Sequence, residues 1–185
     1  MIANFLHFIQ TTKTFAYIVL ASIIISISYA NPNQTGLEGY YMTHIGESGR
    51  QSIVEFFERN GKFYAYGFAN VDGSGPKKDI NNQDPKLKER YDKGSVFVYG
   101  LKQDGRVFSN GQIYNYDDGK IYHLKITKES SGKLTLRASI DKMGMMGKTL
   151  VWTPLTQAQI DQYEKEKPDF SVVEESLNTL PKEYR

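Results

Sequence analysis

The chain has few residues whose types and spacing are typical of catalysis or metal binding. It contains no cysteine, which excludes disulfides and thiolate metal sites. His44 and His123 are far apart and lack the spacing of two ligands on one helix, so we interpret them as hydrogen-bonding residues at a surface or a pocket rim. Asp117-Asp118-Gly119 lacks the alternating ligands and terminal glutamate of a calcium loop and is typical of a hairpin turn.

Motifs for covalent catalysis are incomplete. Ser130-x-x-Lys133 has the spacing of the serine–lysine pair of penicillin-recognising enzymes, but it does not begin a helix and the companion motifs are missing. The sequence has no Gly-x-Ser-x-Gly elbow and no phosphate-cradling loop. A barrel mouth could bring two carboxylates together for sugar hydrolysis, but no spacing favours a particular pair. We therefore expect no enzymatic activity, no cofactor and no metal.

Aromatic residues are the candidates for binding. The chain has 13 tyrosines and 10 phenylalanines against one tryptophan. In a β protein, such residues either pack across neighbouring strands or line a pocket with rings that carry polar tips, and the two roles are compatible. From Lys62 to Ala69, aromatic residues alternate with mostly small ones. This period of two predicts a strand with one aromatic face.

Eight such strands are expected between Leu37 and Trp152. Short turn signals such as Asn60-Gly61 and Asp104-Gly105 separate them. Consecutive hairpins without crossovers predict antiparallel neighbours in sequence order. Eight strands suffice to close a small barrel, which is either filled by side chains or holds one small apolar molecule. The expected strands are residues 37–45, 51–58, 62–69, 95–102, 106–116, 120–128, 133–140 and 148–153.

Asn70 to Gly94 interrupts the strand pattern. Polar loops of this length are commonly lids or binding loops, and we consider this one a candidate lid. Asp84-Pro85 predicts a helix cap followed by proline at the first helical position, with a helical turn to about Arg90. Its basic residues alternate with acidic ones, which favours a solvated face over an anion site.

The pattern changes again after the eighth strand. Thr156 with Gln159 forms a capping box that predicts a helix to about Lys167, and Ser171 with Glu174 predicts a second one. Apolar residues at helical spacing favour packing of these helices on the chain's own barrel. The alternative is a swinging tail that docks a partner.

The first thirty residues resemble an export signal. An apolar run from Phe15 to Ile27 ends at Ser28-Tyr29-Ala30, a signature of signal-peptidase cleavage. The alternative is an uncleaved anchor, although the uninterrupted run is shorter than the roughly 20 residues that span a bilayer. We therefore expect no stable membrane insertion after cleavage. The expected organisation is a signal peptide (1–30), a flexible N-terminus (31–36), a barrel (37–154) and a helical extension (155–185).

A series of short motifs, which follow one another in order along the predicted barrel, resembles a known family. With them the chain resembles a family of small exported bacterial proteins known only as a domain of unknown function, whose fold is lipocalin-like. In lipocalins a tryptophan of the first strand packs under an arginine of a late strand. The resemblance therefore implies that Tyr41, at the tryptophan position, and Arg137 close the barrel floor. The motifs are Gly39-Tyr40-Tyr41, Ile53-Val54-Glu55, Asn82, Asp84-Pro85, Leu87, Arg90, Gly100-Leu101, Gly111, Ile113-Tyr114, Asp118-Gly119-Lys120 with Tyr122, Arg137, Gly147-Lys148-Thr149 and Trp152.

We thus expect an all-β, eight-stranded, antiparallel up-and-down barrel of lipocalin or calycin type, with one or two C-terminal helices. The expected function is non-enzymatic binding or transport of a small apolar or amphipathic ligand, in the periplasm or outside the cell. A filled barrel serving as an envelope interaction or scaffolding module is the alternative. Removal of Lys13 with the expected signal peptide leaves 22 basic against 21 acidic residues, a net charge of +1, and this balance gives no reason to expect nucleic acid or an anionic membrane as a partner.

Strand alternation selects the residues expected to contact the ligand. They are Tyr66, Phe68, Phe97, Tyr99, Tyr114, Tyr122 and Leu124. Met143, Met145 and Met146 are candidates for an adaptable rim because methionine fills irregular shapes. Ordinary hairpin packing is the alternative for these three.

Overall fold

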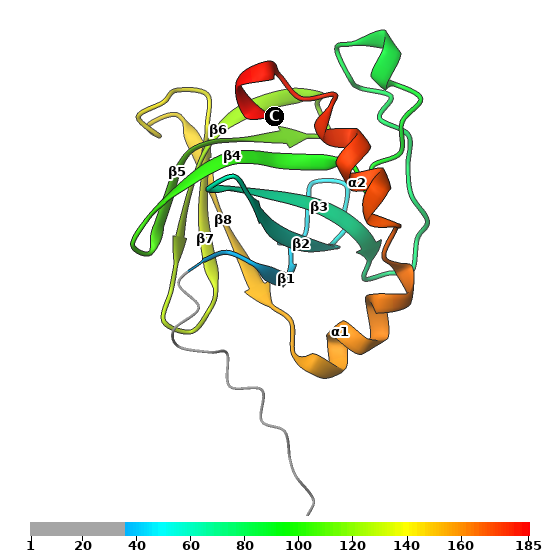
Figure 1. The fold of residues 1–185 in the computed structure, drawn as a ribbon, viewed down its shortest axis with the longest axis horizontal. Helices are drawn as coiled ribbons and strands as arrows, with labels where there is room; N and C mark the ends of the chain where they lie inside the picture. Colours follow the sequence, from blue (N-terminus) through cyan, green and yellow to red (C-terminus); the bar gives the residue numbers. More distant parts are fainter. Residues whose placement is uncertain (1–35) are drawn as a thin grey trace, which may run out of the picture.

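The computed structural model describes residues 36–185, and Figure 1 shows the eight strands wrapped into a barrel. The expected signal peptide and residues 31–35 lie outside the described residues. Neighbours in sequence pair antiparallel all round, which confirms the predicted closed up-and-down topology. The strands are β1 (Gly39–Met42), β2 (Ser52–Arg59), β3 (Lys62–Asn70), β4 (Val96–Asp104), β5 (Val107–Asn115), β6 (Lys120–Lys128), β7 (Leu134–Ser139) and β8 (Gly147–Pro154).

The barrel closes where β1 meets β8. Only two residue pairs form this seam, Tyr41 with Pro154 and Met42 with Thr153. The amide of Leu155 then donates to the carbonyl of Tyr40 at 3.0 Å. The seam has fewer residue pairs than any other pairing of the barrel, but it leaves neither β1 nor β8 as an open sheet edge.

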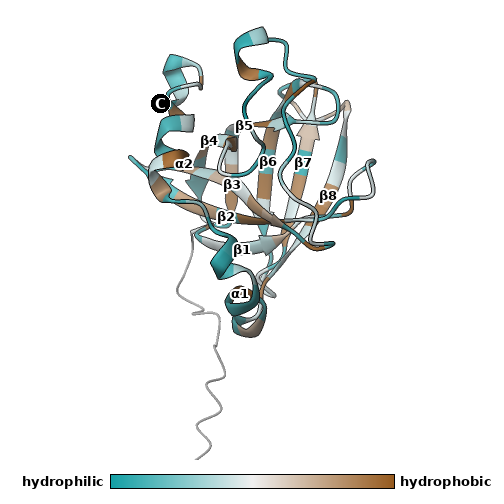
Figure 2. Ribbon diagram, turned by 90° about the vertical axis from the view of Figure 1, so that its right-hand side faces the viewer, coloured by the Kyte–Doolittle hydropathy of each residue, from teal (hydrophilic) through white to brown (hydrophobic). Residues whose placement is uncertain are grey.

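The C-terminal segment covers the outer side of β2, β3 and β4 (Figure 1). Helix α1 (Gln157–Tyr163) is followed by a 3₁₀ turn (Glu164–Glu166), helix α2 (Phe170–Leu177) and a last 3₁₀ turn (Lys182–Tyr184). Two helices packed on the barrel agree with the expectation from the sequence. Figure 2 shows hydrophilic residues prevailing on these helices and hydrophobic ones on the strands.

The capping box at Thr156 and Gln159 begins α1 as predicted. The second predicted box is wrong, because α2 is capped by Asp169, whose carboxylate accepts the amide of Ser171 at 2.8 Å. The sequence Pro168-Asp169 offers an equally favoured N-cap two residues before the serine that we expected, and the helix begins from it.

Two apolar clusters follow from this arrangement, one inside the barrel and one between its outer wall and the C-terminal helices. The inner cluster consists of Leu37, Tyr41, Val54, Phe56, Phe63, Ala65, Val98, Leu101, Phe108, Ile113, Leu124, Ile126, Leu134, Leu136 and Trp152. The outer cluster includes Ile53, Tyr64, Tyr66, Phe68, Val96, Tyr99, Tyr163, Val173, Leu177 and Leu180. Both faces of β3 and β4 are therefore buried, unlike strands with one solvated face.

A β-bulge in β4 changes which side chains face inward. Tyr66 pairs with Val96 while Ala65 pairs with Val98, so Phe97 is an extra residue. Phe97 and Val98 consequently both belong to the inner side, whereas Val96 and Tyr99 pack in the outer cluster. The bulge directs the Phe97 ring toward Trp152, with 6.1 Å between the ring centroids.

Candidate ligand-binding site

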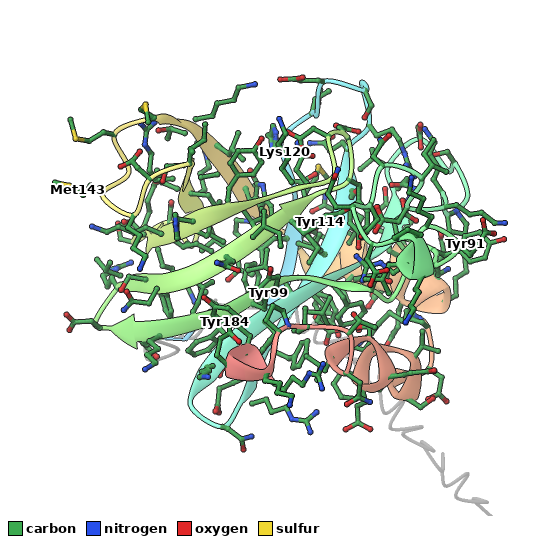
Figure 3. All side chains as sticks on the ribbon, turned by 90° about the horizontal axis from the view of Figure 1, so that it is seen from above. Tyr91, Tyr99, Tyr114, Lys120, Met143 and Tyr184 are labelled. Atoms are coloured by element: carbon green, nitrogen blue, oxygen red, sulfur yellow. The ribbon has the colours of Figure 1, made fainter. Side chains whose placement is uncertain are left out.

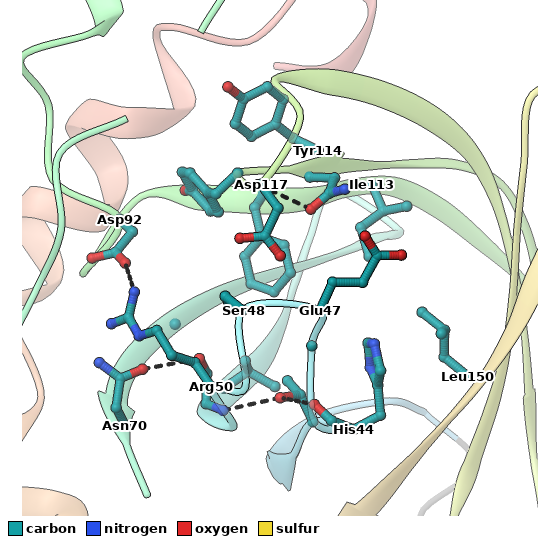
Figure 4. Close-up of a pocket in the computed structure, with 18 of the residues that line it drawn as sticks. His44, Glu47, Ser48, Arg50, Asn70, Asp92, Ile113, Tyr114, Asp117 and Leu150 are labelled. Carbon is teal, nitrogen blue, oxygen red and sulfur yellow. Dashed lines mark hydrogen bonds and ion pairs between the residues drawn. The ribbon is translucent and has the colours of Figure 1, made fainter. Parts of the chain in front are cut away.

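The barrel is hollow at the end where β1 leads into β2 and β7 leads into β8. A cavity of about 750 Å³ opens there, a volume typical of small-molecule sites. Its inner wall is mostly apolar and its mouth is polar (Figure 4). The wall includes Val54, Phe97, Ile113, Tyr122, Ala138, Leu150 and Trp152, and the mouth includes His44, Glu47, Arg50, Asn70, Asp92, Asp117 and Lys148.

Small residues on the inner face leave this end empty. A Cβ added to Gly67 would meet only the carbonyl of Ile53, at 4.0 Å. Ala138 on β7 also lines the cavity. At the opposite end Phe63 and Phe108 pack edge-to-face at 5.2 Å and fill the interior. The position of small and large inner residues therefore decides which half of the barrel is hollow.

Trp152 and His44 connect the apolar wall to the mouth. The Trp152 ring is buried, lies 5.9 Å from Phe56, and its indole N–H donates to Nδ1 of His44 at 3.4 Å. Burial, aided by the positive charge of Lys148, lowers the pKa of His44. The imidazole is thus held neutral, with Nδ1 free to accept.

Charged residues at the mouth pair with one another. The guanidinium of Arg50 lies 3.3 Å from a carboxylate oxygen of Asp92 (Figure 4). It also donates to the carbonyl of Gly75. The ammonium of Lys148 contacts Glu47, and its hydrogen bond and charge lower the pKa of that carboxyl. The mouth thus carries both positive and negative charges, and each of these two basic side chains lies beside an acidic one.

The long loop is anchored through a buried carboxylate. Asp79 is 1 % exposed and accepts hydrogen bonds from Tyr114 at 2.6 Å, Asn82 at 2.7 Å and Arg90 at 3.0 Å. Arg90 was expected on a solvated face, and that expectation is wrong for this residue because the guanidinium forms an ion pair with Asp79. Asp84 caps a short 3₁₀ turn, η1 (Pro85–Leu87), as the Asp-Pro pair predicts.

The seven predicted ligand contacts are divided between three places. Phe97 and Tyr122 line the cavity. Phe68 and Tyr114 line it as well, and they also contact residues outside it, since the Phe68 ring packs on Tyr40 at 6.0 Å and the Tyr114 hydroxyl donates to Asp79. Leu124 belongs to the inner core and is not a lining residue.

Tyr66 and Tyr99 require a correction, because they face away from the cavity. Tyr66 donates to Glu55 on the outer wall and lies 6.5 Å from the ring of Phe170. Tyr99 packs edge-to-face on Tyr184 at 5.1 Å, and burial raises its pKa to about 12. The aromatic face of β3 is the outer face, since helices cover it.

The implied contact between Tyr41 and Arg137 is also wrong. Tyr41 lies inside the barrel and packs edge-to-face on Phe56 at 5.6 Å, and burial raises its pKa to about 12. Arg137 pairs with Lys125 and Thr149 across the strands. Its side chain donates to the carbonyls of Gly144 and Met145 in the loop before β8. Strand alternation places Arg137 outside, since Leu136 and Ala138 face inward.

Several lining residues were missed from the sequence. Leu150 and Trp152 alternate on β8, and this was a usable signal for a shared inner face. Arg50 and Lys148 lie at the mouth, and no local pattern marks them. Of the three methionines proposed for the rim, Met146 lines the cavity, and all three are largely exposed.

Within residues 36–185, no group of three or more histidine, aspartate or glutamate side chains could hold a metal ion. Across that same range, no helix is both long and apolar enough to cross a membrane.

A closed eight-stranded up-and-down barrel with a cavity at one end defines a lipocalin-like protein. Residues 39–154 match the model of a family described as uncharacterized proteins conserved in bacteria, DUF2147, and the chain belongs to this family. Protein HP1028 from the human pathogen Helicobacter pylori, described as belonging to the lipocalin family, has a similar structure. It is 41% identical, with a TM-score of 0.73, and the match covers 77% of this chain and 99% of that one. No curated protein matches the chain.

Proposed function

We propose that the protein binds and carries one small apolar or amphipathic molecule non-covalently. The observation that carries this proposal is the cavity of about 750 Å³, with aromatic and aliphatic side chains inside and charged groups at its mouth. Burial of apolar ligand surface against Phe97, Leu150 and Trp152 would supply the main driving force. A cavity of this size supports carriage over a filled scaffolding barrel.

The arrangement of polar groups favours binding over catalysis. At the mouth, Arg50 is paired with Asp92 and Lys148 with Glu47. His44 accepts a hydrogen bond from Trp152, which occupies one of its nitrogens. The ligand therefore places its apolar part inside and its polar end among these pairs. The similarity to a lipocalin-family protein is consistent with a binding role.

The proposed location is the periplasm or the exterior of the cell. It depends on the apolar run Phe15–Ile27 followed by Ser28-Tyr29-Ala30, which is typical of a cleaved signal peptide. Mass spectrometry of the exported protein tests this. An N-terminus at Asn31 supports the proposal, and one far upstream contradicts it.

Probe binding tests the cavity directly. N-phenylnaphthylamine, an apolar dye that brightens when it leaves water, should bind the wild type and quench Trp152, the single tryptophan. Ala138→Phe places a ring in the cavity and should weaken binding about tenfold or more. Ala158→Phe is the matched control, because Ala158 is exposed on α1.

Gly67→Leu provides a second, independent filling of the same space. Unchanged dye affinity in both Ala138→Phe and Gly67→Leu, with both variants folded, would contradict the proposal. Native mass spectrometry of protein purified from its own host should show a co-purified mass of lipid or cofactor size. Its absence, together with no dye binding, would overturn carriage.

A further inference from the structure

The loop between β7 and β8 displays apolar side chains to solvent beside the cavity mouth. Within residues 36–185, three of the most exposed large hydrophobic residues are Met143 at 85%, Met145 at 74% and Ile140 at 69%. Figure 3 shows Met143 at the edge of the molecule, with its side chain directed away from the barrel. Exposed apolar residues gathered in this way mark an interaction surface.

The loop is held in shape rather than left loose. The carboxylate of Asp141 accepts the amides of Met145 and Met146 at 2.9 and 2.6 Å. Arg137 donates to the carbonyls of Gly144 and Met145 at 2.7 and 3.0 Å. Polar groups therefore fix the backbone of the loop, and the side chains of Met143 and Met145 are left largely exposed to solvent.

The loop and the outer wall at its base carry more positive than negative charge, although the mouth beside them also holds acidic residues such as Glu47 and Asp117. Lys142 lies within the loop, and Lys125 and Arg137 pair across β6 and β7 on the outer wall beside its base. The one carboxylate of the loop, Asp141, accepts backbone amides, which lower its pKa and keep it ionised, so it offsets one of these three positive charges. An apolar tip with basic neighbours is complementary to a surface that has an anionic outer layer and an apolar interior.

The opposite end of the barrel has no comparable feature among the described residues. Its turns are Asn60-Gly61, Asp104-Gly105 and Ser130-Ser131-Gly132, and none of the exposed large hydrophobic residues lies in them. Ile45, which is 66% exposed, belongs to the loop between β1 and β2 and so adds to the cavity end. Of the two ends of the barrel, the end through which a ligand enters is therefore the one with exposed large apolar residues in its loops.

We propose that the loop Ile140–Met146 docks the protein on an anionic lipid surface, with the cavity mouth held beside the membrane. Ile140, Met146 and Lys148 belong both to this rim and to the cavity lining. Docking there would let an amphipathic ligand pass between bilayer and barrel with little exposure to water. The role of docking in ligand transfer rests on the proposed carrier function. The contact between the loop and lipid does not depend on it.

The absence of cysteine makes a site-specific test straightforward. Met143→Cys labelled with the polarity-sensitive dye NBD should shift its emission to the blue with vesicles of phosphatidylcholine and phosphatidylglycerol. The shift should be much smaller with phosphatidylcholine alone. The same label on Ser131→Cys, at the opposite end, should not respond. A response at both sites, or at neither, would overturn the proposal.

Vesicle flotation of unlabelled protein gives the second measurement. The double substitution Met143→Asp with Met145→Asp should lower the bound fraction about tenfold or more, and Lys142→Glu should weaken binding to the anionic vesicles. Val151→Asp is the matched control, because Val151 is exposed on β8 away from the loop. Equal flotation of the double variant and the control would contradict docking through this loop.

Two further outcomes separate this proposal from its alternatives. If the wild type dimerises through the loop and does not float, the occupant is a second copy and the lipid proposal is wrong. Ala138→Phe should still float, and the double methionine variant should still bind N-phenylnaphthylamine from solution. Failure of dye binding with intact flotation would therefore remove the carrier function but leave the docking surface.

Discussion

The hydroxyl of Tyr114 donates to the buried carboxylate of Asp79 across 2.6 Å and joins the long loop to the wall of the barrel. Arg90 contacts the same carboxylate and lies over the Tyr114 ring, 5.5 Å from its centroid. The composition of this loop indicates a solvated lid, but these contacts anchor its middle to the barrel. Its two ends, Gly73–Pro76 and Asp92–Lys93, line the cavity.

Removing the carboxylate should release this loop. Asp79→Ala leaves the Arg90 charge without its partner and should cost about 3 kcal/mol of unfolding free energy. Tyr114→Phe removes one hydrogen bond and should cost about 1 kcal/mol. Urea unfolding measures both, and limited proteolysis should cut within residues 71–95 first in Asp79→Ala. A loop as resistant as in the wild type would contradict the anchoring role.

Two glycines on the inner face should respond in opposite ways to alanine. At Gly67 a Cβ meets nothing closer than 4.0 Å, so Gly67→Ala should be neutral or stabilise by about 0.5 kcal/mol. At Gly111 a Cβ would lie 2.5 Å from the Leu101 side chain and 3.1 Å from its amide nitrogen. Gly111→Ala should therefore cost about 1–3 kcal/mol. Thermal unfolding of both variants checks the contrast, and equal melting temperatures would contradict the positions of hollow and filled space.

Stability should fall on acidification through His44. Its pKa is lowered in the folded state, mainly by burial, from the ordinary value of 6.5. Below pH 6.5 the unfolded chain therefore binds a proton that the folded chain resists, so unfolding becomes easier as the pH falls toward the folded pKa. His44→Gln should reduce the loss of stability over this window. The measurement is urea unfolding, followed by Trp152 fluorescence, above and below pH 6.5; an unchanged pH dependence in His44→Gln would contradict the assignment.

A partly buried ion pair should fasten the C-terminal segment. The ammonium of Lys167 lies 2.9 Å from Glu55 and 2.9 Å from the hydroxyl of Tyr40, while Tyr66 donates to the same carboxylate. Lys167→Met keeps the aliphatic stem but leaves Glu55 without its counter-charge, and should cost about 1–2 kcal/mol.

The matched control for this prediction is Lys165→Met, because Lys165 is exposed and belongs to the 3₁₀ turn that Lys167 caps at its C-terminal end. Hydrogen exchange of α1 and α2 should accelerate in Lys167→Met and not in Lys165→Met. Identical exchange in the two variants would show that packing alone retains the helices.

The strands were predictable because their information is local. Period-two alternation and turns such as Asn60-Gly61 identify each hairpin, and eight consecutive hairpins imply closure. The inward face of β3 was not predictable in this way, since Tyr66 and Ala65 are both buried, on opposite sides of the same sheet. Only the tertiary position of the C-terminal helices decides between the faces.

The site was less predictable than the fold for two further reasons. The bulge at Phe97 shifts the alternation of β4 by one residue, so Phe97 faces inward and Tyr99 outward. The mouth is assembled from loops far apart in the sequence, as the contact between Arg50 and Asp92 illustrates. Alternation within a single strand contains no information about either feature.

The short β1–β8 seam has a consequence for how the protein unfolds and associates. Two residue pairs and one further backbone hydrogen bond join β1 to β8. Partial unfolding should therefore begin at this seam and expose the unpaired backbone of both strands. A freed β8 edge is a template onto which the first strand of another molecule can add. Prolonged storage at high concentration should accordingly yield strand-exchanged oligomers sooner than chemically degraded monomers.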